Sequence, residues 1–110
     1  MQGHDDNVRV LCVGPEFLFS GSWDKTIRVW NLNTLMSHKV LEGHMEAVLA
    51  LAINEQYLVS GSYDTTVRFW DLTSLRCVRN CDGHDDAVRV ITTANGHVFS
   101  GSYDGSIGVW

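Results

Sequence analysis

Short runs of apolar, β-branched and aromatic residues alternate with clusters of turn-forming residues along the whole chain. In its first part the runs are Val8–Val13, Phe17–Ser20 and Thr26–Trp30, followed by a weaker alternating segment at Ser37–Leu41. Runs of this kind, bounded by Gly, Asn, Asp and Ser, predict β-strands. Turn clusters interrupt every stretch of about 11 residues that could carry apolar residues at helical spacing. The pattern therefore predicts an all-β chain.

The same pattern occurs three times at a constant spacing of 40 residues. Residues 3–30, 43–70 and 83–110 align without a gap, and eight positions are identical in all three: Gly, His, Val, Ser, Gly, Ser, Asp and Trp. This period divides the chain into repeat one (3–42), repeat two (43–82) and repeat three (83–110), and the third lacks its last strand. Repeats of this length are typical of solenoids and propellers.

The segments FLFS, YLVS and HVFS are apolar on both alternating faces. A sheet needs apolar residues on both faces only when both faces are covered. We therefore expect sheets stacked against one another.

The order Gly-His, Ser-Gly-Ser-x-Asp, Trp-(Asp/Asn) at this period resembles the WD40 repeat β-propellers. Trp30 is followed by Asn31, which can serve in a turn much as Asp does, and Trp70-Asp71 is the literal pair. The resemblance implies an all-β WD40 propeller segment of about two and three-quarter four-stranded antiparallel blades, as part of a larger propeller of about seven blades.

A propeller closes with about 4–8 blades, so this segment needs further blades or self-association for closure. We expect the strand at 106–110 to present an unpaired edge. Phe17 and Phe99 are expected on the outer faces of the first and last blades, where another blade would cover them.

Each repeat carries a His, a Ser, an Asp and a Trp in fixed order. The resemblance implies a structural tetrad in which Asp holds His, His reaches Ser, and Ser accepts a hydrogen bond from the Trp indole. The three sets are His4, Ser20, Asp24 and Trp30; His44, Ser60, Asp64 and Trp70; and His84, Ser100, Asp104 and Trp110.

Ser, His and Asp are also the components of a hydrolase triad. A catalytic site needs one copy at one cleft, whereas this set occurs in every repeat, and no G-x-S-x-G nucleophile elbow surrounds the serines. A Ser-His-Asp hydrolase is the alternative of another class, but we expect no catalytic residue.

Nothing in the sequence indicates a cofactor or a metal. Histidines on successive blades cannot converge on one ion at about 2 Å, and no phosphate-binding glycine loop is present. The three cysteines, Cys12, Cys77 and Cys81, suit reduced thiols of an intracellular protein in the cytoplasm or nucleus.

Thirteen acidic and eight basic side chains give a formal charge of -5, which disfavours binding to nucleic acid. No apolar run approaches the roughly 18 residues that cross a bilayer, so a membrane partner is not expected. Other proteins or peptides remain as the expected partners.

In WD40 propellers the partner often binds at the loops before the first strand and between the second and third strands. The resemblance therefore implies a partner site at these positions of the three repeats: Asn7, Arg9, Trp23, Leu49, Tyr63, Arg89 and Tyr103. Aromatic residues and arginine are enriched in interface hot spots. The expected function is a protein-protein interaction scaffold or adaptor. The alternative is that the three aromatics merely cover the blade rims.

The turns VGPEF, INEQY and TANGH, between the first and second strands, are short. They are similar to the turns of WD40 substrate receptors that carry an F-box or a RING domain. Substrate recognition for a ubiquitin ligase is therefore an alternative version of the scaffold function.

Overall fold

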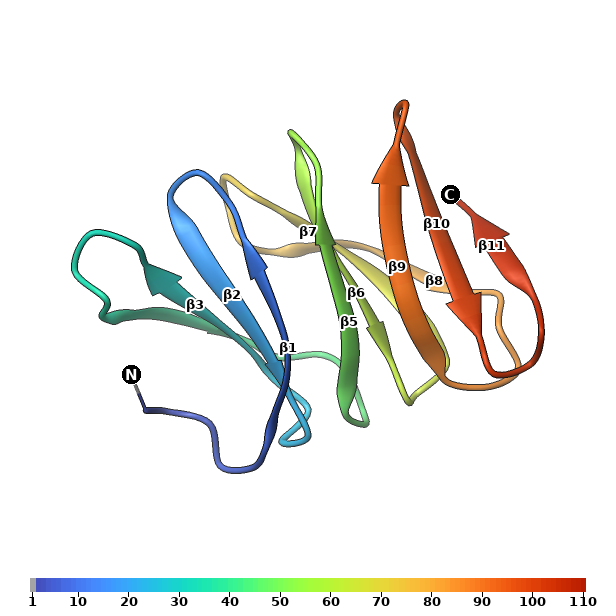
Figure 1. Cartoon of the computed structure of the whole chain (residues 1–110), viewed down its shortest axis with the longest axis horizontal. Helices are drawn as coiled ribbons and strands as arrows, with labels where there is room; N and C mark the ends of the chain where they lie inside the picture. The colour runs from blue at the N-terminus through green and yellow to red at the C-terminus, as the bar shows by residue number, and fades with distance from the viewer. Residues whose placement is uncertain (1) are drawn as a thin grey trace.

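The computed structural model describes residues 2–110, which form three antiparallel sheets of four, four and three strands (Figure 1). We call the sheets blades 1, 2 and 3. Blade 1 contains β1 (Val8–Val13), β2 (Phe17–Ser22), β3 (Ile27–Asn31) and β4 (Ser37–Leu41). Blade 2 contains β5 (Val48–Ile53), β6 (Tyr57–Ser62), β7 (Thr66–Asp71) and β8 (Cys77–Asp82). Blade 3 contains β9 (Val88–Ala94), β10 (His97–Ser102) and β11 (Ile107–Val109). The all-β prediction is confirmed.

Local side-chain hydrogen bonds shape the turn after Trp in blades 1 and 2. The side-chain oxygen of Asn31 accepts hydrogen bonds from the backbone N–H groups of Asn33 and Thr34, at 2.8 and 3.0 Å. Asp71 accepts the equivalent pair from Thr73 and Ser74, at 2.7 and 2.9 Å. The side chains of Asn31 and Asp71 therefore accept equivalent backbone hydrogen bonds in this turn, as predicted.

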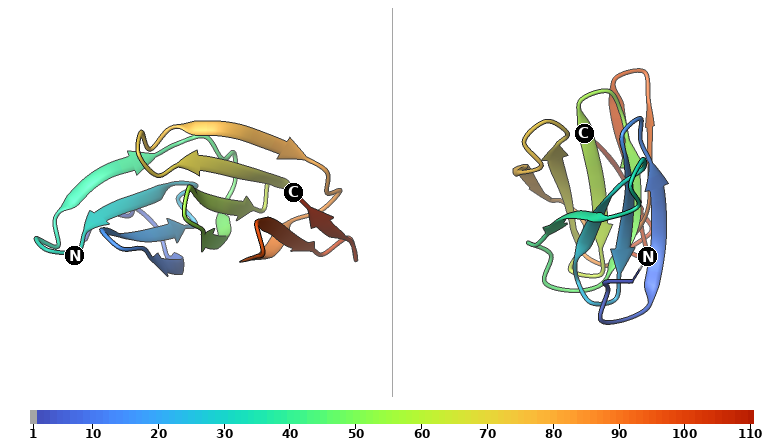
Figure 2. Two further views of the ribbon diagram at one scale, coloured as in Figure 1. Left: turned by 90° about the horizontal axis from the view of Figure 1, so that it is seen from above. Right: turned by 90° about the vertical axis from the view of Figure 1, so that its left-hand side faces the viewer.

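The blades lie side by side along a curve (Figures 1 and 2). Within each blade the strands follow chain order, so β1, β5 and β9 form one edge of their sheets, and β1 contacts β5 as β5 contacts β9. The outer edges of blades 1 and 2 are β4 and β8, whereas in blade 3 the edge strand is β11.

Each blade has a leading face, toward the preceding blade, and a trailing face, toward the next. Between blades 1 and 2, Phe19 and Val29 of the trailing face pack against Leu58 and Trp70 of the next leading face. A second core joins blade 2 to blade 3, with Val59, Val67 and Phe69 against Ile91 and Val98. Both faces of blade 2 are thus covered, which confirms the expectation of stacked sheets.

The prediction for Phe17 is wrong. Phe17 lies on the same side of β2 as Phe19, with ring centroids 6.2 Å apart, and packs against the core between blades 1 and 2. The outer face of blade 1 instead exposes Leu11, on β1. Phe99 does lie on the trailing face of blade 3, directly opposite the exposed Val109.

Candidate functional site

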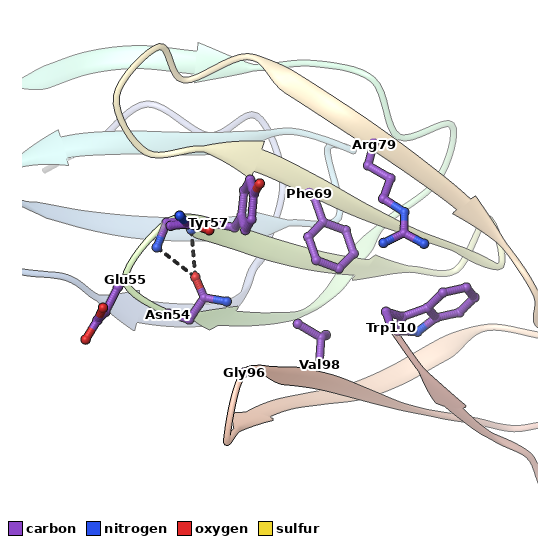
Figure 3. Close-up of a pocket in the computed structure, with 9 residues that line it drawn as sticks. Asn54, Glu55, Tyr57, Phe69, Arg79, Gly96, Val98 and Trp110 are labelled. Atoms are coloured by element: carbon purple, nitrogen blue, oxygen red, sulfur yellow. Dashed lines mark hydrogen bonds between the residues drawn. The ribbon is translucent and has the colours of Figure 1, made fainter.

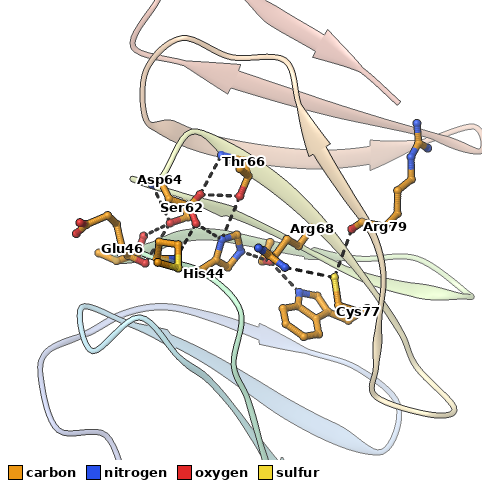
Figure 4. A network of polar contacts seen from close by, with 12 residues as sticks. His44, Glu46, Ser62, Asp64, Thr66, Arg68, Cys77 and Arg79 are labelled. Carbon is orange, nitrogen blue, oxygen red and sulfur yellow. Dashed lines mark hydrogen bonds and ion pairs between the residues drawn. The ribbon is translucent and has the colours of Figure 1, made fainter.

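The four side chains of the blade 2 set form one hydrogen-bonded chain, part of which is labelled in Figure 4. His44 Nδ1 lies 2.9 Å from Asp64 Oδ2, and His44 Nε2 lies 2.6 Å from Ser60 Oγ. The Trp70 indole Nε1–H donates to Ser60 Oγ at 2.9 Å. With Nδ1 protonated, His44 donates to Asp64 and the Ser60 hydroxyl donates to Nε2, so every group in the chain has a partner.

This tetrad joins four separate segments of blade 2. His44 comes from the loop before β5, Ser60 from β6, Asp64 from the turn between β6 and β7, and Trp70 from β7. All but Asp64 are buried. Each polar group left unpaired here would cost about 1–3 kcal/mol, so the tetrad stabilises one arrangement of loop and strands.

Asp64 accepts further hydrogen bonds from the Met45 backbone N–H, at 2.9 Å, and from the Thr66 hydroxyl, at 2.6 Å. Burial by itself raises the pKa of Asp64, but the hydrogen bonds from His44, Thr66 and Met45 outweigh it and hold the pKa well below its ordinary value. Asp64 is therefore an ionised acceptor that ties the loop to the turn.

Blade 1 repeats this geometry, with His4 2.9 Å from Asp24 and 2.6 Å from Ser20. The Trp30 indole donates to Ser20 Oγ at 2.8 Å.

Blade 3 differs at the Asp-His link. His84 Nδ1 lies 2.9 Å from the Ser106 hydroxyl and 3.5 Å from Asp104 Oδ2. Ser106 stands where the other blades have Thr26 and Thr66. A serine hydroxyl rotates more freely than that of a β-branched threonine, and here it lies between the histidine and the aspartate. The expected direct contact is therefore lengthened in this blade.

The order of Ser, His and Asp atoms matches a hydrolase triad, but the serine has no access to a substrate. Ser60 is 0% exposed, and its oxygen already accepts the indole hydrogen bond. A nucleophile must reach a substrate carbonyl, so this geometry supports structure and not acyl transfer.

The predicted partner residues from two loops meet at the same end of each blade. Trp23, Tyr63 and Tyr103 directly follow β2, β6 and β10, and all three side chains are exposed. Their backbone N–H groups donate to the carbonyls of Asn7, Ala47 and Ala87, at 3.0, 2.9 and 3.1 Å. These hydrogen bonds hold the turn that carries each aromatic residue against the loop before the first strand of the same blade (β1, β5 or β9).

Arg89 and Tyr103 form a pair within this surface. Arg89 Nε donates to the Tyr103 hydroxyl at 2.9 Å, and the guanidinium carbon lies 5.7 Å from the ring centroid. The pair is preorganised, because each side chain restricts the rotamers of the other.

Leu49 departs from the expectation. Its side chain is buried in a small cluster with Ala47 and Ala87, where the loop ends of blades 2 and 3 meet. An apolar residue at this position, unlike the arginines of the other blades, packs inward and is not available to a partner. We call the six remaining exposed residues the loop face: Asn7, Arg9, Trp23, Tyr63, Arg89 and Tyr103.

Met45 is an exposed residue that the sequence reasoning missed. It follows His44 on the loop before β5, at the position that Asp5 and Asp85 occupy in the other repeats. The replacement of an acidic residue by an apolar one at this repeat position could have identified Met45 from the sequence.

A pocket of about 570 Å³ lies between blades 2 and 3, lined among others by Tyr57, Phe69, Arg79 and Trp110 (Figure 3). The Arg79 guanidinium carbon lies 5.4 Å from the Phe69 ring centroid. At the corresponding junction of blades 1 and 2, Leu72 lines a smaller pocket of about 130 Å³. The larger pocket is a gap between the sheets of two adjacent blades. Its lining residues do not include a nucleophile next to a general base.

Across residues 2–110, no three His, Cys, Asp or Glu side chains come together as a metal site requires. None of the described residues forms a helix long and apolar enough to span a membrane.

Solved structures with the same fold can be superposed on nearly the whole chain. The computationally designed Ika4 protein matches with a TM-score of 0.90 and 35% identity, over 98% of this chain and 68% of that one. The structure of U3-55K matches with a TM-score of 0.92 and 27% identity, over 100% of this chain and 36% of that one.

Curated relatives match over about one repeat. The zinc finger CCCH domain-containing protein 62 of Arabidopsis thaliana is 51% identical over 35 residues, which are 32% of this chain and 8% of the relative. Mitochondrial division protein 1 of Schizosaccharomyces pombe is 41% identical over 39 residues, 36% of this chain and 6% of the relative. The matched part is thus less than a tenth of each relative's length.

The family model described as "WD domain, G-beta repeat" matches residues 1–31, 35–71 and 75–110. The second and third matches begin before β4 and β8, so each of these sequence units contributes its first strand to one blade and three strands to the next. With matches over almost every residue, this chain belongs to the WD40 repeat family.

Proposed function

We propose that this chain is a protein-interaction scaffold or adaptor that binds a peptide or an extended protein segment through the loop face. The observation that carries the proposal is the set of exposed aromatics, Trp23, Tyr63 and Tyr103, at equivalent positions on three adjacent blades. WD40 domains generally mediate protein-protein interactions, which supports the same conclusion.

The chemistry of the loop face suits a partner that carries both charge signs. Arg9 and Arg89 supply positive charge beside the aromatics, and Trp, Tyr and Arg are the side chains that dominate binding energy at interfaces. Exposed acidic residues lie on the same loops: Asp5, Asp6, Glu46, Asp85 and Asp86. The tetrads hold these loops in place, so the surface is formed before the partner arrives.

We place this function inside the cell, in the cytoplasm or the nucleus, a proposal supported by the three unpaired cysteines, Cys12, Cys77 and Cys81, since disulfides are rare in reducing compartments. The net charge of -5 disfavours nucleic acid as the partner. Substrate recognition for a ubiquitin ligase is a narrower version of the proposal, which rests only on the short turns, and no structural feature adds to it.

The test uses peptides selected from a random display library against the immobilised chain. Calorimetry then compares the selected peptides on wild type, Trp23→Ala and Tyr63→Ala, with Val78→Ala on β8 as an exposed control away from the loop face. We expect each loop-face variant to weaken binding by about 2 kcal/mol, or roughly thirtyfold, with thermal melts unchanged. Wild-type affinity in both variants would show that the aromatics only cover the blade rims.

A further inference from the structure

An apolar hollow lies where blades 1 and 2 meet, at the end of the blades opposite the loop face. It is lined by Pro15 and Phe17 at the turn between β1 and β2, by Ile53 at the end of β5, and by Leu72 just after β7. The β1–β2 and β5–β6 turns lie at the upper end of the blades in Figure 1, whereas the turns of the loop face lie at the lower end. Both blades that form the hollow have four strands, so it belongs to a junction between two whole blades.

The hollow has the size of one apolar side chain. Its volume is about 130 Å³, and an apolar cavity of about 150 Å³ accepts a benzene molecule. Phe17, Ile53 and Leu72 are partly buried and pack against the core between the two blades. A leucine side chain from another molecule would therefore be enclosed by apolar groups on several sides.

Backbone hydrogen bonds fix the turns around the hollow. The Gly14 N–H donates to the Phe17 carbonyl at 2.8 Å, and the Leu72 N–H donates to the Gln56 carbonyl at 3.1 Å. The side-chain oxygen of Asn54 accepts a hydrogen bond from the Gln56 N–H at 2.8 Å. A site that is already formed does not lose this ordering entropy when a partner binds.

Two glutamates flank the hollow, one from each blade. Glu16 lines it directly, and Glu55 lines the groove that continues from it past Pro15. Both glutamates are exposed, and the ion pairs within residues 2–110 all join a tetrad histidine to its aspartate. No Lys, Arg or His is among the described residues that line the hollow or the groove. Unpaired negative charge beside an apolar hollow complements a partner segment in which cationic residues flank an apolar one.

The next junction lacks this combination of groups. Blade 2 has Glu55 where blade 1 has Pro15, and blade 3 has Thr93 where blade 2 has Ile53. The Thr93 hydroxyl donates to the Ile53 carbonyl at 3.1 Å, so it forms a polar contact at the position where the hollow has an apolar wall. The hollow is thus a feature of the junction between blades 1 and 2, and is not repeated at each junction.

We propose that the hollow is a second docking site, which binds a basic peptide segment of a partner protein. One apolar side chain of the segment fills the hollow, and a lysine or arginine on either side of it faces Glu16 and Glu55. Burial of the apolar side chain supplies affinity, and the two carboxylates select for basic flanking residues. The hollow and the loop face lie at opposite ends of the blades, so the proposal does not depend on binding at the loop face.

An NMR titration of the isotope-labelled 110-residue chain with three pentapeptides tests the proposal. The first peptide has a central leucine with two lysines on each side, the second has serine at its centre, and the third has glutamates in place of the lysines. We expect the leucine peptide to shift the amide signals of Glu16, Glu55 and Leu72 and to leave that of Tyr63 on the loop face unchanged. The serine peptide should bind at least about tenfold more weakly, because the hollow gains no apolar contact. The acidic peptide should not bind.

The double variant Glu16→Gln with Glu55→Gln tests the part played by charge. We expect it to bind the leucine peptide roughly three- to tenfold more weakly than wild type, as expected for the loss of two exposed ion pairs. The matched control is Glu46→Gln with Asp85→Asn, which removes two exposed carboxylates at the loop-face end and should leave binding unchanged. The spectra of the free variants show that each keeps its fold.

Several results would overturn the proposal. These are an absence of shifts around the hollow with the leucine peptide, equal affinity for the serine peptide, and wild-type affinity in the double variant. An equal loss of affinity in the matched control would mean that the peptide responds only to net charge. Shifts confined to the loop face would assign the peptide to that surface, and would overturn the proposal as well.

Discussion

Asp64 is the residue at which the loop before β5, the turn after β6 and the buried tetrad meet. Its two carboxylate oxygens accept hydrogen bonds from His44, Met45, Thr66 Oγ1 and the Thr66 backbone N–H. Burial opposes its ionisation, and these donors reverse that effect, so the pKa of Asp64 is lowered in the folded chain.

The lowered pKa predicts a loss of stability in acid. A carboxyl group with a lowered folded pKa stabilises the fold above its unfolded pKa of about 3.9, and this contribution is lost as the pH falls through the folded value. We therefore expect the unfolding free energy of wild type to fall below about pH 4. In Asp64→Asn it should be lower at neutral pH and depend less on pH in this range.

Urea unfolding between about pH 5 and pH 2 measures this dependence. Glu46→Gln, on the same loop but exposed, is the control for the removal of one charge. Asp24 and Asp104 also have lowered pKa values, so the slope is reduced in Asp64→Asn and not abolished. Equal slopes in wild type and Asp64→Asn would contradict the expected role of the carboxylate.

At the scale of the strands and turns, the three blades share one pattern, but blade 3 differs in the hydrogen bonds of its tetrad and in its last strand. In blades 1 and 2 a threonine hydroxyl donates to the tetrad aspartate at 2.6 Å and leaves the histidine to bond that aspartate directly. In blade 3 the Ser106 hydroxyl is the closest partner of His84 Nδ1. Blade 3 also ends in β11, a strand of three residues with a partner on one side only.

Ser106→Thr should strengthen blade 3. The Ser106 hydroxyl already donates to Asp104 Oδ1 while it lies 2.9 Å from His84 Nδ1. Threonine restricts the hydroxyl to fewer rotamers and has a higher strand propensity, so we expect it to keep the hydrogen bond to Asp104, to lie farther from His84 and to restore the direct Asp104–His84 hydrogen bond. The unfolding free energy should rise by about 0.5–1 kcal/mol. The reverse change, Thr66→Ser in blade 2, should lower it by a similar amount, and a loss of stability in Ser106→Thr would contradict this account.

At the scale of the whole molecule, stability depends on how closely the blades approach one another. Gly61 on β6 faces blade 3, and a Cβ there would lie 2.6 Å from Val88 Cγ1 and 3.0 Å from Ile91 Cδ1. Gly101, at the same position of blade 3, has only Val90 of its own blade within reach.

Gly61→Ala should therefore lower the unfolding free energy by about 1–3 kcal/mol through overpacking. Gly101→Ala is the matched control, with an expected change near zero because the exposed Val90 can rotate away. Urea unfolding of both variants, each compared with wild type, measures the difference. Equal losses would show that blade-to-blade approach is not the cause.

Much of the fold was predictable from local pattern. The predicted runs Val8–Val13 and Ser37–Leu41 coincide with β1 and β4, because apolar alternation and turn residues bound them clearly. The predicted second strand stopped at Ser20, whereas β2 continues to Ser22. Gly21 and Ser22 have the composition of a turn, but Gly21 pairs with Ile27 inside the sheet. The glycine is needed here for packing and not for a turn, because Val48 of the next blade leaves no room for a side chain.

By itself the sequence determined the β class, the three repeats, and the recurrence of His, Ser, Asp, Trp and the aromatic turn residues at fixed positions, because each depends on local pattern and exact periodicity. That the four recurring side chains form a tetrad was implied by the family resemblance. Only the tertiary structure decided which side of a strand meets another blade. It turned Phe17 inward, buried Leu49 beside Ala47 and Ala87, and left Leu11 and Val109 exposed. Alternation says that two faces are apolar, but whether a face is covered depends on residues 40 positions away in the chain, which must fold against it first.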